Sequence, residues 1–367
     1  MEYIRIMKGK KYLCFAAAIL LSVGATAQQS VAQKAKNDLI QKTTFGGYVV
    51  GKASATDQDG SNHSSFDLRM ARVYVNGQVL DFKYRLQMEV TGGGVGETNE
   101  KSARIVDAYG EWVKYKFFNV RFGQFKRAFT FENPMNPWDI GFGGYSQLTT
   151  KLAGMGDRVG EHSSGGRDMG VQISGDLLPI GQDKHNFLHY QLALYNGQGI
   201  NQKEQNNSKD LIGGVYVYPI KDLAIGVFGW NGSFTKNGIT VDRNRMAAGL
   251  KYESKWTVRA EYATSKGYKI SHYDANGDLK ANACDKADAW YMTVGAPVSK
   301  KCKVYAKWDV YRDTREWDSM KAQYCLSANY YFHKNFKLQA NYSYTRDKAT
   351  SGDGRYNTFD LQMYWRF

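Results

Sequence analysis

Residues 82–90 read FKYRLQMEV, and this stretch decides the fold because apolar and polar side chains alternate in it without a break. A period of two is that of a β-strand, and it places Phe82 and Leu86 on one face and Lys83 and Arg85 on the other. The same alternation recurs at residues 255–262, 303–310 and 336–344. Repeated amphipathic strands predict an all-β protein.

A soluble β-sandwich also shows this alternation, so two further features choose between a sandwich and a membrane barrel. Aromatic residues stand near the ends of the apolar faces, as the interfacial girdle of a barrel requires; examples are Phe82, Trp256, Phe336 and Tyr344. Tight connections also alternate with long polar ones, which is typical of outer-membrane barrels. We therefore expect a transmembrane antiparallel β-barrel over residues 43–367, with both termini in the periplasm.

The expected barrel has about sixteen strands of about ten residues each. They lie near residues 44–54, 66–75, 80–91, 104–116, 118–126, 167–177, 187–196, 210–219, 222–231, 242–253, 255–266, 287–297, 301–312, 321–332, 335–345 and 358–367.

The N-terminus reads as a cleaved signal peptide over residues 1–27. A basic start precedes an apolar run that is too short for a transmembrane helix, and Ala25-Thr26-Ala27 is a small-x-small cleavage site. Residues 28–42 would then form a short periplasmic segment. The whole chain carries a formal net charge of +14, but export argues against nucleic acid as a partner.

The chain ends on an amphipathic strand whose apolar face includes Trp365 and Phe367. A terminal Phe on such a strand resembles the signal that the barrel assembly machinery reads. We therefore expect an integral protein of the outer membrane, in contact with membrane lipid and lipopolysaccharide.

The longest connection spans residues 127–166 and contains Phe129, Phe131 and Trp138. A connection of this length in a compact domain suggests a function. Its aromatic side chains would be sheltered if it folded into the barrel, where it would act as a constriction loop. The alternative is an external flap packed on the rim.

The polar faces of the strands carry more bases than acids, which would concentrate anions in the pore. The alternative is a set of compensated ion pairs, such as Arg259 with Glu261 and Lys307 with Asp309, that only brace the barrel. The residues expected along an anion path are Lys83, Arg85, Arg121, Lys126, Arg243, Arg245, Lys255, Arg259, Lys303 and Lys307.

Four stretches resemble the phosphate-selective porin O and P family, in its Bacteroidetes branch. They are residues 66–77 (FDLRMARVYVNG), 82–87 (FKYRLQ), 107–109 (DAY) and 120–126 (VRFGQFK). The resemblance implies a sixteen-stranded barrel, often trimeric, that passes small anions such as phosphate. The family's arginine ladder and lysine cluster cannot be placed residue by residue here.

A passive pore without cofactor or metal is therefore the expected function. Asp57-Gln58-Asp59-Gly60 and residues 274–278 look faintly like calcium loops, but they lack the distal Glu and suit ordinary turns. No GxSxG or HExxH motif points to an enzyme. The alternative function is a surface receptor or adhesin that uses the long loops of the same barrel.

Overall fold

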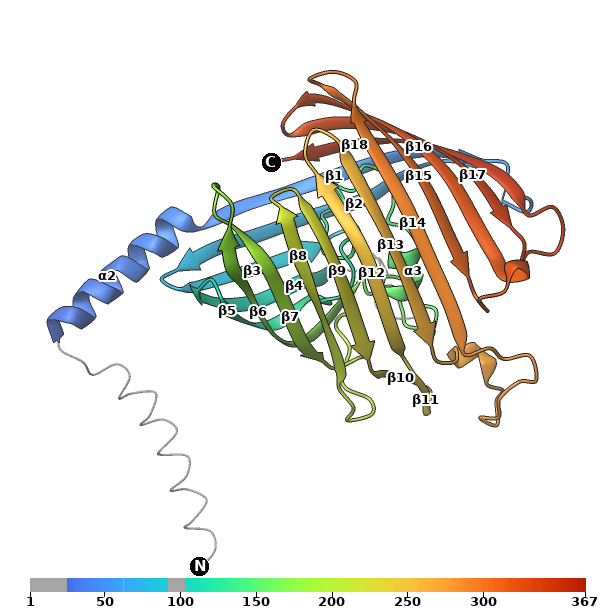
Figure 1. Cartoon of the computed structure of the whole chain (residues 1–367), viewed down its shortest axis with the longest axis horizontal. Coiled ribbons are helices and arrows are strands. Elements are labelled where there is room, and N and C mark those ends of the chain that lie inside the picture. The colour runs from blue at the N-terminus through green and yellow to red at the C-terminus, as the bar shows by residue number, and fades with distance from the viewer. Residues whose placement is uncertain (1–24, 62, 92–102) are drawn as a thin grey trace, which may run out of the picture.

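A computed structural model of the chain describes residues 25–61, 63–91 and 103–367. Sixteen strands form a closed antiparallel barrel in which each strand pairs with its neighbours and β1 (Thr44–Thr56) pairs with β18 (Arg355–Arg366) (Figure 1). The register of this closing pair runs from Tyr48 opposite Arg366 to Thr56 opposite Thr358. The expected fold class is confirmed.

The remaining strands follow one another around the barrel in the order of the chain. They are β2 (His63–Val79), β3 (Phe82–Glu89), β4 (Arg104–Tyr115), β5 (Phe118–Lys126), β6 (Arg167–Ile180), β7 (His185–Tyr195), β8 (Asp210–Ile220), β9 (Leu223–Asn231), β12 (Asn244–Glu253), β13 (Thr257–Lys266), β14 (Lys286–Pro297), β15 (Cys302–Arg312), β16 (Met320–His333) and β17 (Phe336–Asp347).

One small sheet lies outside the barrel and was not expected from the sequence. Strands β10 (Ser233–Lys236) and β11 (Ile239–Asp242) form a hairpin in the connection from β9 to β12. Asn237 and Gly238 turn the chain with φ values of 54° and 79°. Two successive positive φ values suit a type I′ hairpin turn, so the Asn-Gly pair was the signal for this hairpin.

The barrel wall divides the side chains as the alternation requires. On β13, Arg259 and Glu261 point inward and are buried, whereas Tyr262 points outward and is exposed. The outer face of β18 likewise exposes Leu361, Met363 and Trp365. An apolar outer face and a polar inner face are what a barrel in lipid needs.

A helix near the N-terminus, α2 (Ala25–Lys42), leads into β1 at the end of the barrel where the C-terminus lies (Figure 1). The Asp38 carboxylate accepts a hydrogen bond from the Leu80 amide at 3.1 Å and pairs with Lys42 at 3.0 Å. The expected cleavage point after residue 27 falls within α2, and residues 1–24 lie outside the described part of the chain. Among the described residues, no helix has the length and apolar character needed to cross a membrane.

The terminal Phe367 gives a prediction about assembly. Its backbone N–H donates to the Gly47 carbonyl at 3.0 Å, and its side chain is exposed on the outer face. A carboxylate near the membrane interface destabilises a barrel by only about 1 kcal/mol or less. We therefore expect Phe367→Asp to refold nearly normally in detergent but to accumulate poorly as folded barrel in cells.

The measurement is the amount of heat-modifiable, membrane-inserted protein in cells, compared with refolding in detergent. Lys348→Asp, in the exposed connection before β18, is the matched control and should accumulate normally. A normal cellular yield for Phe367→Asp would show that this residue is no assembly signal.

Candidate functional site

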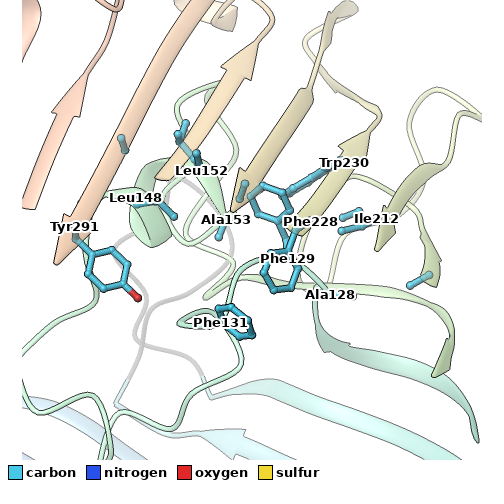
Figure 2. Packing of buried hydrophobic residues seen from close by; sticks show 14 of the residues in the cluster. Ala128, Phe129, Phe131, Leu148, Leu152, Ala153, Ile212, Phe228, Trp230 and Tyr291 are labelled. Carbon is cyan, nitrogen blue, oxygen red and sulfur yellow. The ribbon is translucent and has the colours of Figure 1, made fainter. Parts of the chain in front are cut away.

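Residues 127–166, here called the inner loop, connect β5 to β6 and lie inside the barrel. The loop includes the short helix α3 (Gln147–Leu152), which begins at the capping residue Ser146. Figure 2 shows Phe129, Phe131 and Leu148 directed toward inward-facing side chains of the wall. The expectation of an inward-folded loop is confirmed, and the alternative of an external flap is wrong.

The wall makes room for the inner loop with small inward-facing side chains. A methyl group leaves space for a second layer of chain inside the barrel, where a longer side chain would fill the lumen. The alanines that pack in the same cluster as the loop are Ala193, Ala224, Ala247, Ala263, Ala287 and Ala289. The lumen is therefore filled on the side of β7 to β14.

Three aromatic residues were expected to form the constriction. In the structure they fix the inner loop to the barrel wall. Phe129, Phe131 and Trp138 are all buried. The Phe129 ring lies 5.5 Å from Trp230, Phe131 lies 5.1 Å from Phe228, and Trp138 lies 5.9 Å from Tyr364, measured between ring centroids. These rings pack on the wall and give the loop its position; none of them lines the cavity described below.

Buried carboxylates of the wall hold the backbone of the inner loop. The Glu261 carboxylate accepts hydrogen bonds from the N–H groups of Phe131 at 2.7 Å and Glu132 at 2.9 Å. The Asp309 carboxylate accepts from the Gln147 N–H at 2.9 and 3.1 Å, at the start of α3. These bonds satisfy loop amides that would otherwise be buried without a partner.

Side chains of other strands hold the loop through its carbonyl groups. The Lys337 ammonium of β17 donates to the Trp138 carbonyl at 2.7 Å, and the Asn329 amide of β16 donates to the Gly141 carbonyl at 2.9 Å. The Arg259 guanidinium of β13 donates to the Ile140 carbonyl at 2.7 Å. These bonds fix the loop to β13, β16 and β17.

The two ends of the inner loop meet in a buried cluster of charges around Trp230. Arg127 pairs with Asp168 at 2.7 Å, and Arg243 pairs with Asp210 at 2.7 Å. Glu161 lies between the two arginines and pairs with both. The guanidinium groups of Arg127 and Arg243 stack on the Trp230 ring, 5.0 and 4.7 Å from its centroid. We call Arg127, Glu161, Asp168, Asp210, Trp230 and Arg243 the arginine cluster.

Arg245 makes a further anchor on the neighbouring turn of the loop. Its guanidinium pairs with Asp157 at 2.5 Å and donates to the Leu152 carbonyl at 2.6 Å. Burial opposes ionisation of Asp157, but the Arg245 charge and hydrogen bonds outweigh it and lower the pKa of Asp157 to about 2. This pair therefore stays ionised at neutral pH.

In the described part of the chain, an open region of the lumen lies between the edge of the inner loop at residues 134–137 and the wall from β1 to β7. A cavity of 310 Å³ remains there, which we call the eyelet. Its charged lining consists of one acid, Asp107, and six bases: Arg72, Arg85, Arg121, Lys126, Arg127 and Arg167. A second cavity of 380 Å³ shares Arg85 and Tyr109 with the eyelet and reaches Lys42 and Lys83 at the end with the tight turns. The two cavities together mark a path along β2 to β4.

The local backbone of β5 contributes to the shape of this wall. Gly123 has φ 133°, and a Cβ atom there would lie 2.2 Å from the Ala108 carbonyl oxygen of β4. A side chain at this position is therefore excluded by both conformation and space. Gly123 lets β5 approach β4 closely between Arg121 and Phe125, which both line the eyelet.

Most bases of the eyelet are paired with acids of neighbouring strands. The distances are 2.7 Å for Arg72–Glu89, 3.4 Å for Arg85–Asp107, 2.9 Å for Arg121–Glu111 and 2.7 Å for Arg167–Asp107. Lys126 differs, because within the described residues it has no ion pair and donates to the carbonyl groups of Asn133 and Met135 and to the Tyr145 hydroxyl. The positive excess of the eyelet is therefore small.

The ten bases that were predicted from the sequence to line the pore lie in different parts of the structure. Arg85, Arg121 and Lys126 line the eyelet, and Lys83 lines the second cavity. Lys303 donates to the Thr257 hydroxyl at 2.7 Å, and Lys255 is exposed in the turn before β13. The others are buried beneath the inner loop: Arg243, Arg245, Arg259 and Lys307.

The alternative of compensated ion pairs is partly right. Lys307 pairs with Asp309 at 3.4 Å, but Arg259 pairs with Glu253, because Glu261 is occupied by the loop amides. The eyelet bases that sequence reasoning missed are Arg72, Arg127 and Arg167. Arg72 stands in one of the stretches quoted for the family resemblance, which was a usable signal.

Comparison with known proteins agrees with this geometry. Residues 47–213 match the family model described as phosphate-selective porin O and P, and all lining residues of the eyelet lie in that range. The resemblance found in the sequence is thereby confirmed for that part of the chain. A search of curated proteins found no match.

Several solved structures share the fold. The chain is similar to OmpT, an outer membrane protein of Vibrio cholerae (15% identity, TM-score 0.59, 89% of this chain and 97% of that one). It is also similar to the outer membrane channel DcaP of Acinetobacter baumannii (14%, 0.59, 89% and 97%) and to Salmonella typhi OmpF in complex with daunomycin (11%, 0.63, 89% and 97%). At these identities the likeness shows the fold, which is that of an outer-membrane porin barrel.

Proposed function

We propose that this chain is a passive diffusion channel of the outer membrane that prefers small anions. The eyelet is the observation that carries the proposal, because it is an opening beside a fixed loop and six of its seven charged lining residues are bases. A positively lined constriction raises the local concentration of anions.

The pairing of the eyelet bases sets the expected strength of this preference. Conduction requires an attraction that admits an ion and also releases it. Because Arg72, Arg85 and Arg121 already have carboxylate partners, they lower the barrier for an anion without binding it tightly. A moderate anion preference follows, and the family resemblance adds phosphate as a candidate solute.

The proposal includes the biology expected from the sequence. Residues 1–27 serve as a cleaved signal peptide, residues 28–42 remain in the periplasm, and the barrel is inserted by the assembly machinery among lipid and lipopolysaccharide. The family resemblance adds a homotrimer. The role is that of a channel and not of an enzyme, since the eyelet bases and the loop edge provide an ion path.

The reversal potential in planar bilayers tests the anion preference. Under an about tenfold KCl gradient centred near 0.1 M, where screening acts over about 10 Å, the wild type is expected to be anion-selective. The double substitution Arg85→Gln and Arg121→Gln should shift the reversal potential toward cations, because Glu111 loses its partner.

The control for this experiment is Lys255→Gln, which removes one positive charge from an exposed turn outside the eyelet. Its reversal potential should match that of the wild type. A wild type without anion selectivity would contradict the anion preference. A purified, folded barrel that conducts no ions would contradict the channel itself and favour the receptor alternative.

A further inference from the structure

The eyelet has two faces of different chemistry. The edge of the inner loop at residues 134–137 contributes Pro134, Met135, Asn136 and Pro137, whereas Arg127 and Ala128 line the eyelet where the loop leaves β5. Pro134 is exposed and Met135 is partly exposed, so their apolar surfaces face the opening. The opposite face is the wall that carries the arginines. A solute in the eyelet therefore meets apolar surface on one side and positive charge on the other.

The arginines of the wall are themselves partly covered by aromatic rings. The Arg121 guanidinium lies 4.7 Å from the centroid of Tyr109 and 5.3 Å from that of Phe125. The Arg72 guanidinium lies 5.9 Å from the centroid of Tyr48. The flat face of each group rests on a ring and its edge bonds a carboxylate, so part of the hydrogen-bonding capacity of each guanidinium is used within the wall.

Inorganic phosphate suits such an eyelet poorly. It is hydrated on all sides, and in a narrow passage it would lose water toward the side chains of Pro134 and Met135, which offer no hydrogen bond. The paired arginines would replace only part of that hydration. An anion that carries its charge at one end and an apolar body at the other would lose much less.

We infer that the channel favours organic monoanions with an apolar body, such as aromatic carboxylates, over inorganic phosphate. The inference rests on the proposed function and names the solute class of the same eyelet. The carboxylate meets the wall at Arg85 and Arg121, and the apolar body passes along Met135. The 310 Å³ eyelet is near the lower end of the range of about 300–1,000 Å³ for small-molecule sites, which suits a solute with one ring.

The test compares benzoate with inorganic phosphate in the same bilayer. Reversal potentials are measured with potassium chloride on one side and potassium benzoate or potassium phosphate on the other, at a pH of about 6, where both probes are largely monovalent. We expect the benzoate permeability to exceed that of phosphate at least about threefold, the factor that follows from removing roughly 30 Å² of apolar surface from water.

Met135 offers a matched pair of variants. Its carbonyl group holds Lys126 and Tyr145, and its side chain lines the eyelet and also packs against the cluster of Ile140, Phe142 and Tyr305. Met135→Gln keeps the length of the side chain but makes it polar, and it should bring the benzoate-to-phosphate permeability ratio close to one. Met135→Leu keeps the side chain apolar and should retain the preference.

The outcomes separate this inference from the proposed function. An anion-selective channel in which phosphate permeates as well as benzoate, or better, would overturn the inference and leave the anion channel in place. An unchanged permeability ratio in Met135→Gln would also overturn it. A channel without conductance or anion selectivity would refute the proposed function first.

Discussion

Replacing residues 134–154 with a short Gly/Ser linker is expected to raise the single-channel conductance several-fold and to weaken ion selectivity. The replacement removes α3 and the loop edge that forms one side of the eyelet. The lumen beside Ala247 and Ala263 would then fill with water, because the wall side chains at these two positions are small. Ions would no longer pass close to Arg85 and Arg121, so the positive wall would act on fewer of them.

The control for this replacement is a shortened connection at residues 348–354, which lies between β17 and β18 on the outside of the barrel. Both proteins are first checked for heat-modifiable, folded barrel. The control should keep the wild-type conductance. A wild-type conductance in the folded loop replacement would show that the inner loop does not obstruct the path.

Substituting Arg243 in the arginine cluster is expected to have the largest effect on stability. Arg243→Met leaves Glu161 and Asp210 buried without one of their cationic partners. Removing one member of a buried ion pair destabilises a protein by about 3–5 kcal/mol. The free energy of unfolding, measured by urea titration of the barrel in detergent, should fall by that amount, and current noise should rise as the loop end loosens.

Two further variants isolate the cause. Lys255→Met removes an exposed charge and should change the free energy of unfolding by less than about 0.5 kcal/mol. Arg243→Lys keeps the charge, but an ammonium group cannot bond Glu161, Asp210 and the Gly197 carbonyl as the planar guanidinium does. Its free energy of unfolding should therefore lie between those of the wild type and Arg243→Met. Equal stability of Arg243→Met and the wild type would mean that the cluster does not anchor the loop.

The barrel was predictable from the sequence because its signal is local and repeated. Alternation at residues 82–90 and 255–262, and the order of tight and long connections, gave sixteen strands close to their observed bounds. Each strand needs an apolar outer face toward lipid, so the alternation of apolar and polar residues extends along the strand. The β10–β11 hairpin escaped notice because it is short, although its Asn-Gly turn was visible.

The place of the eyelet was not predictable by the same reasoning. Alternation distinguishes side chains that face the lumen from side chains that face lipid. It does not indicate which part of the lumen wall a folded loop will cover. Arg245 of β12 and Arg85 of β3 both face inward, yet Arg245 is buried beneath the loop and Arg85 lines the path. The inward alanines, such as Ala247 and Ala263, were a usable signal for the covered side.

The missed bases have individual explanations. Arg72 lies on β2 close to an irregularity at residues 50 and 51 of its partner β1, which obscures the period of two in this part of the sequence. Arg127 belongs to the inner loop, and Arg167 is the first residue of β6, directly after the loop. Alternation assigns no face to a loop residue, and it assigns a face only weakly at the end of a strand. Only the folded loop could therefore show that Arg127 and Arg167 reach the eyelet.

Confinement of the ion path to the eyelet is tested most directly by cysteine accessibility. In a background without the four native cysteines, a single cysteine is placed at Gln191, which lines the eyelet, or at Ala247, which is buried beneath the inner loop. A negatively charged thiol reagent is added while current is recorded. We predict that the current through Gln191→Cys falls and that the current through Ala247→Cys does not change. Block of Ala247→Cys with no effect on Gln191→Cys would contradict the eyelet as the path.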